Sequence, residues 1–271
     1  MTNCLLQSTE AMQMFSAYMK VTGMAHLGPE PGGDPELIGK RLGLINGASW
    51  ITLWSNFFGR LYLPGVHLIN VGNEAIQINF MAAFQAGLPT PPQSNIDAFV
   101  RYARDLVELA QVDAVLITCS TMNRSFPLVQ KALDPYHVPV VPIDGPMMER
   151  AVIHGGRILV VATGAPTVGS TQALLREKAA EMGCPGVFSG LVVEEGYQRL
   201  ARGDIDGHNR VLAEKIRDQL AKEEIGCVVL AQLSMSIFLL SYPDPVSEFG
   251  VPILTSAQCG FEHVRTLLVR R

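Results

Sequence analysis

The sequence predicts an α/β fold of two pseudo-symmetric lobes, each a parallel sheet flanked by helices, with the site in the cleft between the lobes. Short apolar runs alternate with longer amphipathic patterns, and this alternation is typical of α/β proteins with right-handed crossovers. The apolar runs are continuous, as expected for parallel strands that helices cover on both faces. The predicted strands are residues 41–46, 66–71, 114–119, 138–143, 157–163, 190–194, 227–232 and 251–256.

An internal repeat supports the two lobes. A helix, the segment DAVLITCSTM, a second helix and the segment VPVVPIDGPMMERAV occupy residues 100–152. The same order returns over residues 208–264 with CVVLAQLSMS, a loop and VPILTSAQCGFEHV. In open parallel sheets the ligand lies outside the carboxyl ends of the strands, so a cleft between two such lobes is the expected site.

The composition restricts the class of protein. The chain has 271 residues, enough for two small domains or one large one. Hydrophobic residues make up 48% and charged residues 17%, which suits a well-buried globular protein. The net charge of −4 comes without a long run of either sign, so we expect no nucleic-acid partner. No apolar stretch is long enough to span a membrane, so we expect no membrane association.

The five cysteines favour a reducing compartment. They are odd in number, widely spaced and without a C-x-x-C pair, a pattern that argues against a disulfide framework and against a structural zinc site. The first residues show no basic region followed by an apolar block, so no secretory signal is expected. We therefore expect a cytoplasmic protein.

The N-terminal region differs from the rest of the chain. Residues 9–21 contain good helix formers and predict a helical arm that packs on the body or on a second subunit, so we expect a homo-oligomer. The following segment, 23–39, is rich in Gly and Pro and predicts a linker. The chain then divides into an extension of residues 1–39, a first lobe of residues 40–145 plus 255–271, and a second lobe of residues 146–254.

Amphipathic helices separate the predicted strands. One is predicted over residues 94–111, with Ser94 and Asn95 as N-cap candidates, and another over residues 207–222. The segments 47–58 and 233–249 are expected to be loops beside the site. Their large apolar side chains indicate a larger or less polar ligand than aspartate, or core and dimer contacts.

Polar residues follow several predicted strands at their carboxyl ends. Cys119 is the sharpest candidate, because it stands at a strand end before two hydroxyl residues and a helix start. Backbone N–H groups and the positive helix terminus at such a place lower the pKa of a thiol and attract anions. Ser120 and Thr121 can then donate to a carboxylate. The structural alternatives are a small buried thiol and two helix-capping hydroxyls. The other strand-end groups are Asn46 to Ser49, Thr163 to Thr167 and Gln232 to Ser234.

Six segments carry a resemblance to a known family through their residues and their order. They are VLITCSTM (115–122), VPVVPIDGPMMERAV (138–152), GRILVVATGAPTV (156–168), RLARGDIDGHNRVLAEKIRDQL (199–220), VVLAQLSMS (228–236) and VPILTSAQCGF (251–261). This ordered set resembles the aspartate/glutamate/hydantoin racemase superfamily, which also includes arylmalonate decarboxylases and maleate isomerases. The resemblance covers residues 40–268. It implies an enzyme that needs no metal, pyridoxal phosphate or nucleotide, so no cofactor is expected.

The resemblance also assigns roles to residues. Racemases of this superfamily have two cysteines, one on each lobe, that act across the cleft as an acid–base pair. Cys119-Ser120-Thr121 matches the first cysteine motif, whereas Gln232 stands where the second thiol belongs. A carboxamide does not exchange protons at neutral pH, so symmetrical two-thiol racemisation is not expected. Cys259 and the single histidines are weaker candidates for a replacement.

These observations predict an isomerase or epimerase that acts at a carbon next to a carboxylate or carbonyl of a small-molecule substrate. Cys119 and Gln232 are the predicted catalytic residues, with Gln232 donating a hydrogen bond to an enolate or carboxylate oxygen. Two alternatives remain open, a decarboxylase of the same superfamily and a non-catalytic protein that binds small carboxylates. The predicted substrate-binding residues are Asn46, Ser120, Thr121 and Thr163.

Overall fold

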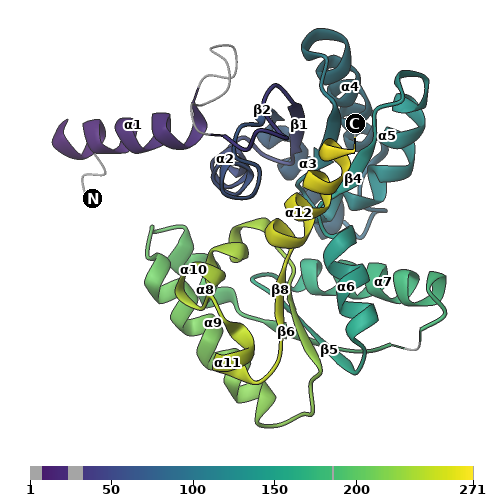
Figure 1. The fold of residues 1–271 in the computed structure, drawn as a ribbon. Helices are drawn as coiled ribbons and strands as arrows, with labels where there is room; N and C mark the ends of the chain where they lie inside the picture. The colour runs from purple at the N-terminus through teal and green to yellow at the C-terminus, as the bar shows by residue number, and fades with distance from the viewer. Residues whose placement is uncertain (1–7, 24–32, 185, 271) are drawn as a thin grey trace.

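The computed structural model describes residues 8–23, 33–184 and 186–270, which form two four-stranded parallel sheets with helices around them (Figure 1). The strand orders are β2-β1-β3-β4 in the first sheet and β6-β5-β7-β8 in the second. In both sheets the first strand in the chain lies between the second and the third, and the fourth lies at the edge beyond the third. The predicted fold class and the internal repeat are therefore confirmed. The strands are β1 (Arg41–Asn46), β2 (His67–Gly72), β3 (Ala114–Ile117), β4 (Val140–Pro142), β5 (Arg157–Ala162), β6 (Val187–Val192), β7 (Cys227–Leu230) and β8 (Ile253–Thr255).

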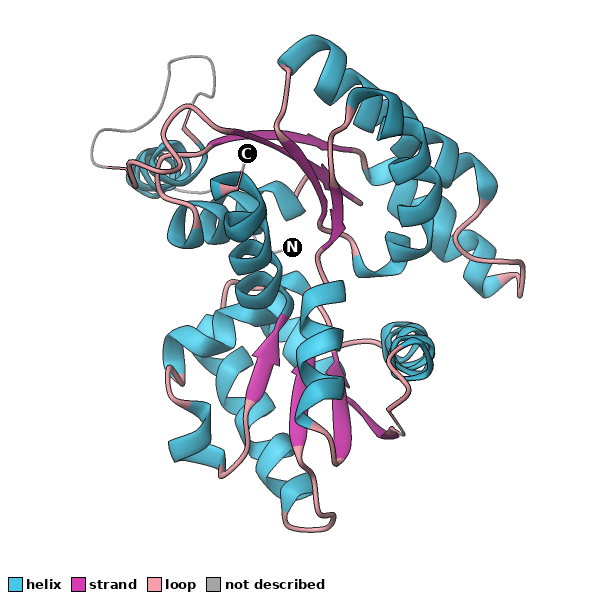
Figure 2. Ribbon diagram, turned by 45° about the vertical axis from the view of Figure 1, so that its right-hand side comes forward, coloured by secondary structure: helices cyan, strands magenta, loops and turns pink. Residues whose placement is uncertain are grey.

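Helices cover both faces of each sheet (Figure 2). Those of the first half are α1 (Ser8–Thr22), α2 (Ile51–Tyr62), α3 (Glu74–Gln85), α4 (Gln93–Ala110), the 3₁₀ helix η2 (Ser120–Ser125), α5 (Phe126–Leu133) and η3 (Asp134–Tyr136). Those of the second half are α6 (Gly145–His154), α7 (Ala165–Glu181), α8 (Glu194–Leu200), α9 (Ile205–Leu220), η4 (Leu233–Ile237), α10 (Phe238–Ser241), α11 (Pro245–Phe249) and α12 (Ser256–Val269).

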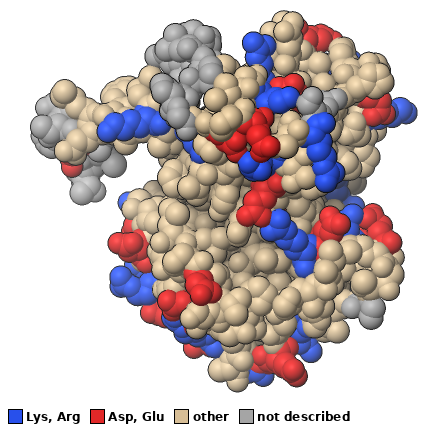
Figure 3. All heavy atoms as spheres, in the orientation of Figure 1, with Lys and Arg blue, Asp and Glu red and all other residues tan. Residues whose placement is uncertain are grey.

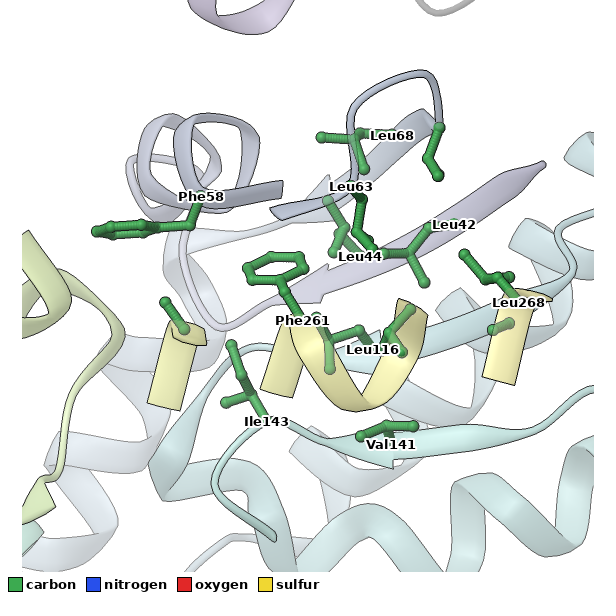
Figure 4. Packing of buried hydrophobic residues seen from close by; sticks show 14 of the residues in the cluster. Leu42, Leu44, Phe58, Leu63, Leu68, Leu116, Val141, Ile143, Phe261 and Leu268 are labelled. Carbon is green, nitrogen blue, oxygen red and sulfur yellow. The ribbon is translucent and has the colours of Figure 1, made fainter. Parts of the chain in front are cut away.

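The helix α12 joins the two halves of the molecule. It follows β8 of the second sheet, yet Phe261, Val264 and Leu268 are fully buried in a cluster with Leu42 and Leu44 of the first sheet (Figure 4). In the opposite direction, α6 follows β4 of the first sheet and packs in the core of the second. The chain therefore crosses twice between the sheets. The division into residues 40–145 plus 255–271 and 146–254 stays a prediction.

The two crossings touch each other. A Cβ on Gly260 of α12 would lie 2.9 Å from the carbonyl oxygen of Ile143, in the connection between β4 and α6. Real Cβ atoms do not come so close to backbone, so only glycine allows α12 to lie against this connection. The carboxyl end of β4 is consequently held at the junction of the lobes.

Several predictions about individual elements are wrong. The strands predicted at 114–119 and 227–232 end two residues early, at Ile117 and Leu230, and two connecting residues lead from each strand into the 3₁₀ helices η2 and η4. The strand predicted at 190–194 is β6, an edge strand in which no residue is fully buried, so helices do not cover it on both faces. The segments 47–58 and 233–249, expected as loops, contain α2 and the helices η4, α10 and α11.

Most of the large apolar residues of these two segments belong to the core, whereas Trp50, Leu53 and Leu240 are exposed. Phe58 and Phe238 are fully buried, and Trp54 and Phe57 pack against the cluster that contains Phe58. Their size therefore gives no information about the ligand.

The caps predicted for the helix at 94–111 are also wrong. The helix α4 begins at Gln93, and the preceding Pro92 makes no side-chain cap hydrogen bond. Asn95 instead lies buried in the first turn, where its Nδ2 donates to the carbonyl of Ile76 at 2.9 Å and its Oδ1 accepts from Asn79 at 2.8 Å. These two hydrogen bonds link α4 to α3, and they satisfy the polar atoms of the buried amide.

The predicted N-terminal helix is confirmed as α1, which extends away from both sheets (Figure 1). Met12, Phe15 and Tyr18 on it are exposed. Its end is held to α2 by Arg60, whose Nη1 donates to the carbonyl of Lys20 at 3.0 Å. Most of the linker predicted at 23–39 lies outside the described residues.

The surface carries both signs of charge over both lobes on the face in Figure 3, without a large region of one sign. Among the helices of the described residues, none combines the length and the apolar character needed to cross a membrane.

Candidate active site

Cys119 lies just beyond the carboxyl end of β3, at the start of η2. Its backbone is extended (φ −107°, ψ 108°), and its half-buried Sγ lies 3.2 Å from Thr121 Oγ1. Burial raises the pKa of the thiol, although the Thr121 hydroxyl and the main-chain N–H groups of Met122 and Thr121 act to lower it. The expected lowered pKa is therefore wrong, because desolvation outweighs the amides. The thiol is neutral at rest and needs a neighbouring group or substrate to ionise.

The loop after β1 presses against the thiol. A Cβ on Gly47 would lie only 2.4 Å from Cys119 Sγ, so the absence of a side chain lets the loop approach. Glu74 at the start of α3 holds the loop by accepting from the N–H of Ser49 at 2.9 Å and from the Ser49 hydroxyl. These hydrogen bonds keep the pKa of Glu74 below its ordinary value. The loop after β1 is thus held between the thiol of Cys119 and the carboxylate of Glu74.

Asn46 is fully buried at the end of β1 and does not border the interlobe cavity. Its Oδ1 accepts hydrogen bonds from Ser55 and Thr118, both at 2.6 Å. Its Nδ2 donates to Asn70 at 3.1 Å and to the carbonyl of Val71 at 3.2 Å. Since Thr118 directly precedes Cys119, these contacts position the strand end that carries the thiol.

Gln232 occupies the corresponding place in the second sheet, after β7 and at the start of η4. Its backbone is extended (φ −133°, ψ 140°), like that of Cys119. Its Oε1 accepts from both the N–H and the hydroxyl of Thr163, each at 2.8 Å. Both acceptor positions of the amide oxygen are used in this way, so only the NH₂ group of the carboxamide remains for other hydrogen bonds.

The strand register makes this correspondence definite. Ile45 pairs with Ile117 in the first sheet, and Val161 pairs with Leu230 in the second. Two residues beyond these pairs stand Gly47 and Cys119 in the first lobe and Thr163 and Gln232 in the second. Gly47 therefore corresponds to Thr163, and Cys119 corresponds to Gln232. The two lobes therefore present different chemistry at equivalent positions.

A hydrogen bond connects the two strand ends across the lobes. The hydroxyl of Ser120 donates to the carbonyl of Ala231 at 2.9 Å. These residues directly follow Cys119 and directly precede Gln232. The structure therefore brings together the strand ends that carry the two predicted catalytic residues.

A cavity of about 470 Å³ lies beside this contact, between the lobes. Ser120 and Thr121 line it, and Arg124 lies at its border, paired with Glu177 of α7 at 2.9 Å. The other lining residues are Phe80, Phe84, Thr90, Ala165, Pro166, Gly169, Ser170 and Leu174. The size is that of a small-molecule site, with four hydroxyl residues and one cation among apolar side chains. Cys119 contacts this wall through Thr121, whereas Thr163 and Gln232 do not line the cavity.

Some residues of the site were not selected from the sequence. No sequence pattern marks Arg124 or the aromatic residues of α3, because their position depends on the packing of helices. A pattern does mark Asp144, because it directly follows the predicted strand 138–143 at its carboxyl end. It is fully buried, and burial raises its pKa to about 6.

Cys259, Cys227 and the histidines of the described residues do not line the cavity. Cys259 is fully buried in the core of the second lobe, and burial raises its pKa to about 11. Cys227 lies in the same core, and burial raises its pKa to about 12. His208 is fully buried with Nδ1 at 2.8 Å from the carbonyl of Gly196, and burial lowers its pKa. Asp204 of the resemblance motif caps α9 by accepting from the N–H of Gly207 at 2.9 Å.

No group of three or more His, Cys, Asp or Glu side chains suited to a metal ion occurs within residues 8–23, 33–184 and 186–270.

Comparison with known proteins agrees with this geometry. The sequence matches the Asp/Glu/hydantoin racemase family over residues 76–264. The chain belongs to this family. The resemblance predicted from the sequence is thereby confirmed. No curated protein matches the sequence significantly.

Three solved structures show the extent of the similarity in fold. An aspartate racemase homologue from Pyrococcus horikoshii OT3 is 18% identical, with a TM-score of 0.58 over 84% of this chain and 99% of that one. Allantoin racemase from Klebsiella pneumoniae is 18% identical, with a TM-score of 0.57 over 86% and 89%. Glutamate racemase from Francisella tularensis subsp. tularensis SCHU S4, solved in complex with D-glutamate, is 15% identical, with a TM-score of 0.58 over 85% and 81%. The racemase family fold thus accounts for most of the chain.

Proposed function

We propose that this racemase-family chain is a cofactor-independent isomerase or epimerase that moves a proton at a carbon next to a carboxylate or carbonyl, with Cys119 as its single thiol. The observation that carries the proposal is the position of Cys119 at the carboxyl end of β3, joined through Thr121 to a cavity between the lobes. Ligands of parallel α/β sheets lie at the carboxyl ends of the strands, so a proton carrier at this place would reach a bound carbon acid. Membership of the racemase family is consistent with that role.

The cavity suits a small molecule with at least one carboxylate or carbonyl group. Ser120 and Thr121 donate hydrogen bonds to its oxygens, and Arg124 supplies the positive charge at the border. The apolar remainder of the wall, which includes Phe80 and Phe84, accommodates the rest of the substrate.

The remaining predicted residues do not line the cavity and act on the site through hydrogen bonds to its neighbours. Asn46 fixes Thr118 and so the position of Cys119. Thr163 holds the oxygen of Gln232 and leaves its NH₂ group to donate to an enolate or carboxylate oxygen. We place the enzyme in the cytoplasm, because the number and spacing of its cysteines suit a reducing compartment. We expect a homo-oligomer, because the exposed apolar side chains of α1 suit contact with a second copy.

The test is exchange of the α-hydrogen in deuterated water, followed by NMR for a panel of small chiral carboxylates and cyclic amides. Proton transfer by a positioned group contributes on the order of 100-fold or more, so Cys119→Ala and Cys119→Ser should lose at least about that factor. Cys184→Ala is the matched control, because Cys184 is half-buried against the core of the second lobe.

Exchange at the wild-type rate in Cys119→Ala would contradict the proposal. Loss of CO₂ from a malonate of the panel, again dependent on Cys119, would favour the decarboxylase. Binding of the panel without any exchange or turnover would favour a non-catalytic carboxylate-binding protein.

A further inference from the structure

A buried carboxyl group lies beside the proposed site and has no role in it so far. Asp144 sits between the carboxyl end of β4 and the start of α6 and is fully buried. Asn123 of η2 donates from Nδ2 to Asp144 Oδ2 at 2.7 Å. Asp144 Oδ1 and Asn123 Oδ1 are both buried and accept no hydrogen bond from the described residues. An uncompensated buried carboxyl is costly, and such groups occur at sites where a proton is exchanged.

Ser120 connects this carboxyl group to the cavity. Its side chain lines the cavity, and its hydroxyl donates to the carbonyl of Ala231 at 2.9 Å. Ser120 stands three residues before Asn123 in η2, so the two side chains lie on the same face of this 3₁₀ helix as the contact with Asp144. Ser120 and Asn123 both oppose the rise in the pKa of Asp144 that burial causes. A hydroxyl donates one proton and accepts through two lone pairs. It can therefore pass its own proton into the cavity while taking another from Asp144.

Asp144 also acts on Cys119. Its charge is one of the causes that raise the pKa of the Cys119 thiol, so the two groups resist being ionised together. The charged side chains of the helices around this junction have partners of their own. Arg150 of α6 pairs with Glu262 of α12 at 2.8 Å, and Arg124 of η2 pairs with Glu177. Near neutral pH, Cys119 and Asp144 together hold one negative charge.

We propose that Asp144 is a positioning residue that supplies a proton, through Ser120, to a substrate oxygen while Cys119 takes the proton from the adjacent carbon. The proposal rests on the proposed function, because it assigns the second acid–base group of that same reaction. It explains how a site with a carboxamide at Gln232 can still work with an acid and a base.

The step balances as follows. The reactive form of the pair arises when the single proton shared by the two groups moves from the Cys119 thiol to the Asp144 carboxylate. The Cys119 thiolate then takes the α-proton, so the C–H bond breaks and an S–H bond forms. The electron pair of the C–H bond becomes the C=C bond of an enol, and the carbonyl oxygen takes the hydroxyl proton of Ser120. Ser120 regains a proton from the carboxylic acid of Asp144, which is left as a carboxylate. One negative charge has moved from sulfur to Asp144. The reverse transfers return a proton to carbon, and they give the epimer when the enol turns its other face to Cys119 before it is protonated.

The first experiment does not depend on any substrate. The rate of iodoacetamide alkylation of Cys119 is measured against pH by peptide mapping in the wild type, Asp144→Asn and the control Asp134→Asn. Asp134 is an exposed carboxyl of the same lobe that accepts a hydrogen bond from Gln130 at 3.0 Å. Removal of the Asp144 charge should shift the midpoint of the Cys119 profile to lower pH, and Asp134→Asn should leave it unchanged. An unchanged midpoint in folded Asp144→Asn would overturn the proposal, whatever the exchange assay shows.

The second experiment follows α-hydrogen exchange against pH for the best substrate of the panel. The wild-type rate should rise as Asp144 loses its proton and fall when Cys119 also ionises, because the active pair holds one proton. Asp144→Asn should exchange about 100-fold more slowly and lose the acidic limb, so that its rate follows only the ionisation of Cys119. A merely structural role for Asp144 would lower the rate but keep the acidic limb, and that result would overturn the proposal.

Ser120→Ala keeps the proposal testable should Asp144→Asn fail to fold. It should lose exchange by a similar factor while the alkylation midpoint of Cys119 stays near that of the wild type, because Asp144 and its charge remain. Full exchange in Ser120→Ala would overturn the proton path. If the wild type exchanges no substrate, the proposed function fails, and the alkylation midpoints still decide whether Cys119 and Asp144 share one charge.

Discussion

The substitution Gly47→Ala tests the geometry of the thiol directly. The new Cβ would lie 2.4 Å from Sγ and 3.1 Å from Cβ of Cys119. Non-bonded contacts are favourable from about 3.5 Å, so the thiol or the loop must move by about 1 Å. The loop is held by the hydrogen bonds from Ser49 to Glu74, so we expect much of the displacement to fall on the sulfur. A misplacement of about 1 Å can cost on the order of 100-fold in proton transfer.

The assay combines α-hydrogen exchange with alkylation of Cys119 and with urea unfolding. Gly47→Ala should lower exchange by about 100-fold and alter the alkylation rate, at a stability cost of about 1–3 kcal/mol for overpacking. Gly164→Ala is the matched control, because its Cβ would meet only Pro166 Cδ, at 3.9 Å. Wild-type rates of both exchange and alkylation in Gly47→Ala would refute the close approach of this loop to the thiol.

Three further predictions concern stability and use urea or thermal unfolding. Gln232→Leu should cost about 1–3 kcal/mol, because the buried N–H of Thr163 loses its acceptor, whereas Gln232→Glu should cost less; equal losses would contradict this. Asp144 has a folded pKa of about 6, above its ordinary 3.8, so the wild type should lose up to about 3 kcal/mol as pH rises between these values, and Asp144→Asn should lack that loss; parallel pH profiles would argue against the shift. Phe261→Ala should cost about 3–5 kcal/mol, because the ring is fully buried between α12 and the first sheet; a cost under about 1 kcal/mol would contradict that packing.

The fold could be predicted from the sequence because its strands are buried and short. Continuous apolar runs separated by amphipathic segments leave few alternatives to parallel sheets. The position of Cys119 followed from the same reasoning, since polar residues at the carboxyl ends of parallel strands meet at one edge. Asp144 escaped selection although the same rule applies to it, because a lone acid at a strand end resembles an ordinary helix start. The interior network of Asn46 was equally hidden, because Ser55 and Asn70 come from separate elements.

Quantities that depend on the balance of opposing effects could not be predicted from the sequence. The pKa of Cys119 was expected to fall because of the nearby N–H groups, and these groups do act in that direction. Burial acts in the opposite direction and is larger, and only coordinates reveal how much solvent the sulfur loses. The same applies to α2, where Trp54 and Phe57 mark a helix face that packs on the core, not a ligand-binding loop.

The two lobes share one backbone plan and differ in how a side chain is accommodated at the strand ends. In the first lobe, Gly47 leaves room for the thiol of Cys119. In the second lobe, Thr163 stands at the equivalent position, and its N–H and its hydroxyl both donate hydrogen bonds to the side-chain oxygen of Gln232. The thiol and the carboxamide are therefore each matched to a neighbour, and exchanging Gln232 alone for cysteine would leave two donors of Thr163 without a partner. Because Gln232 and Thr163 satisfy each other by hydrogen bonds, the proposed mechanism takes its second proton-exchanging group from the first lobe, where the buried carboxyl of Asp144 contacts Asn123 of η2.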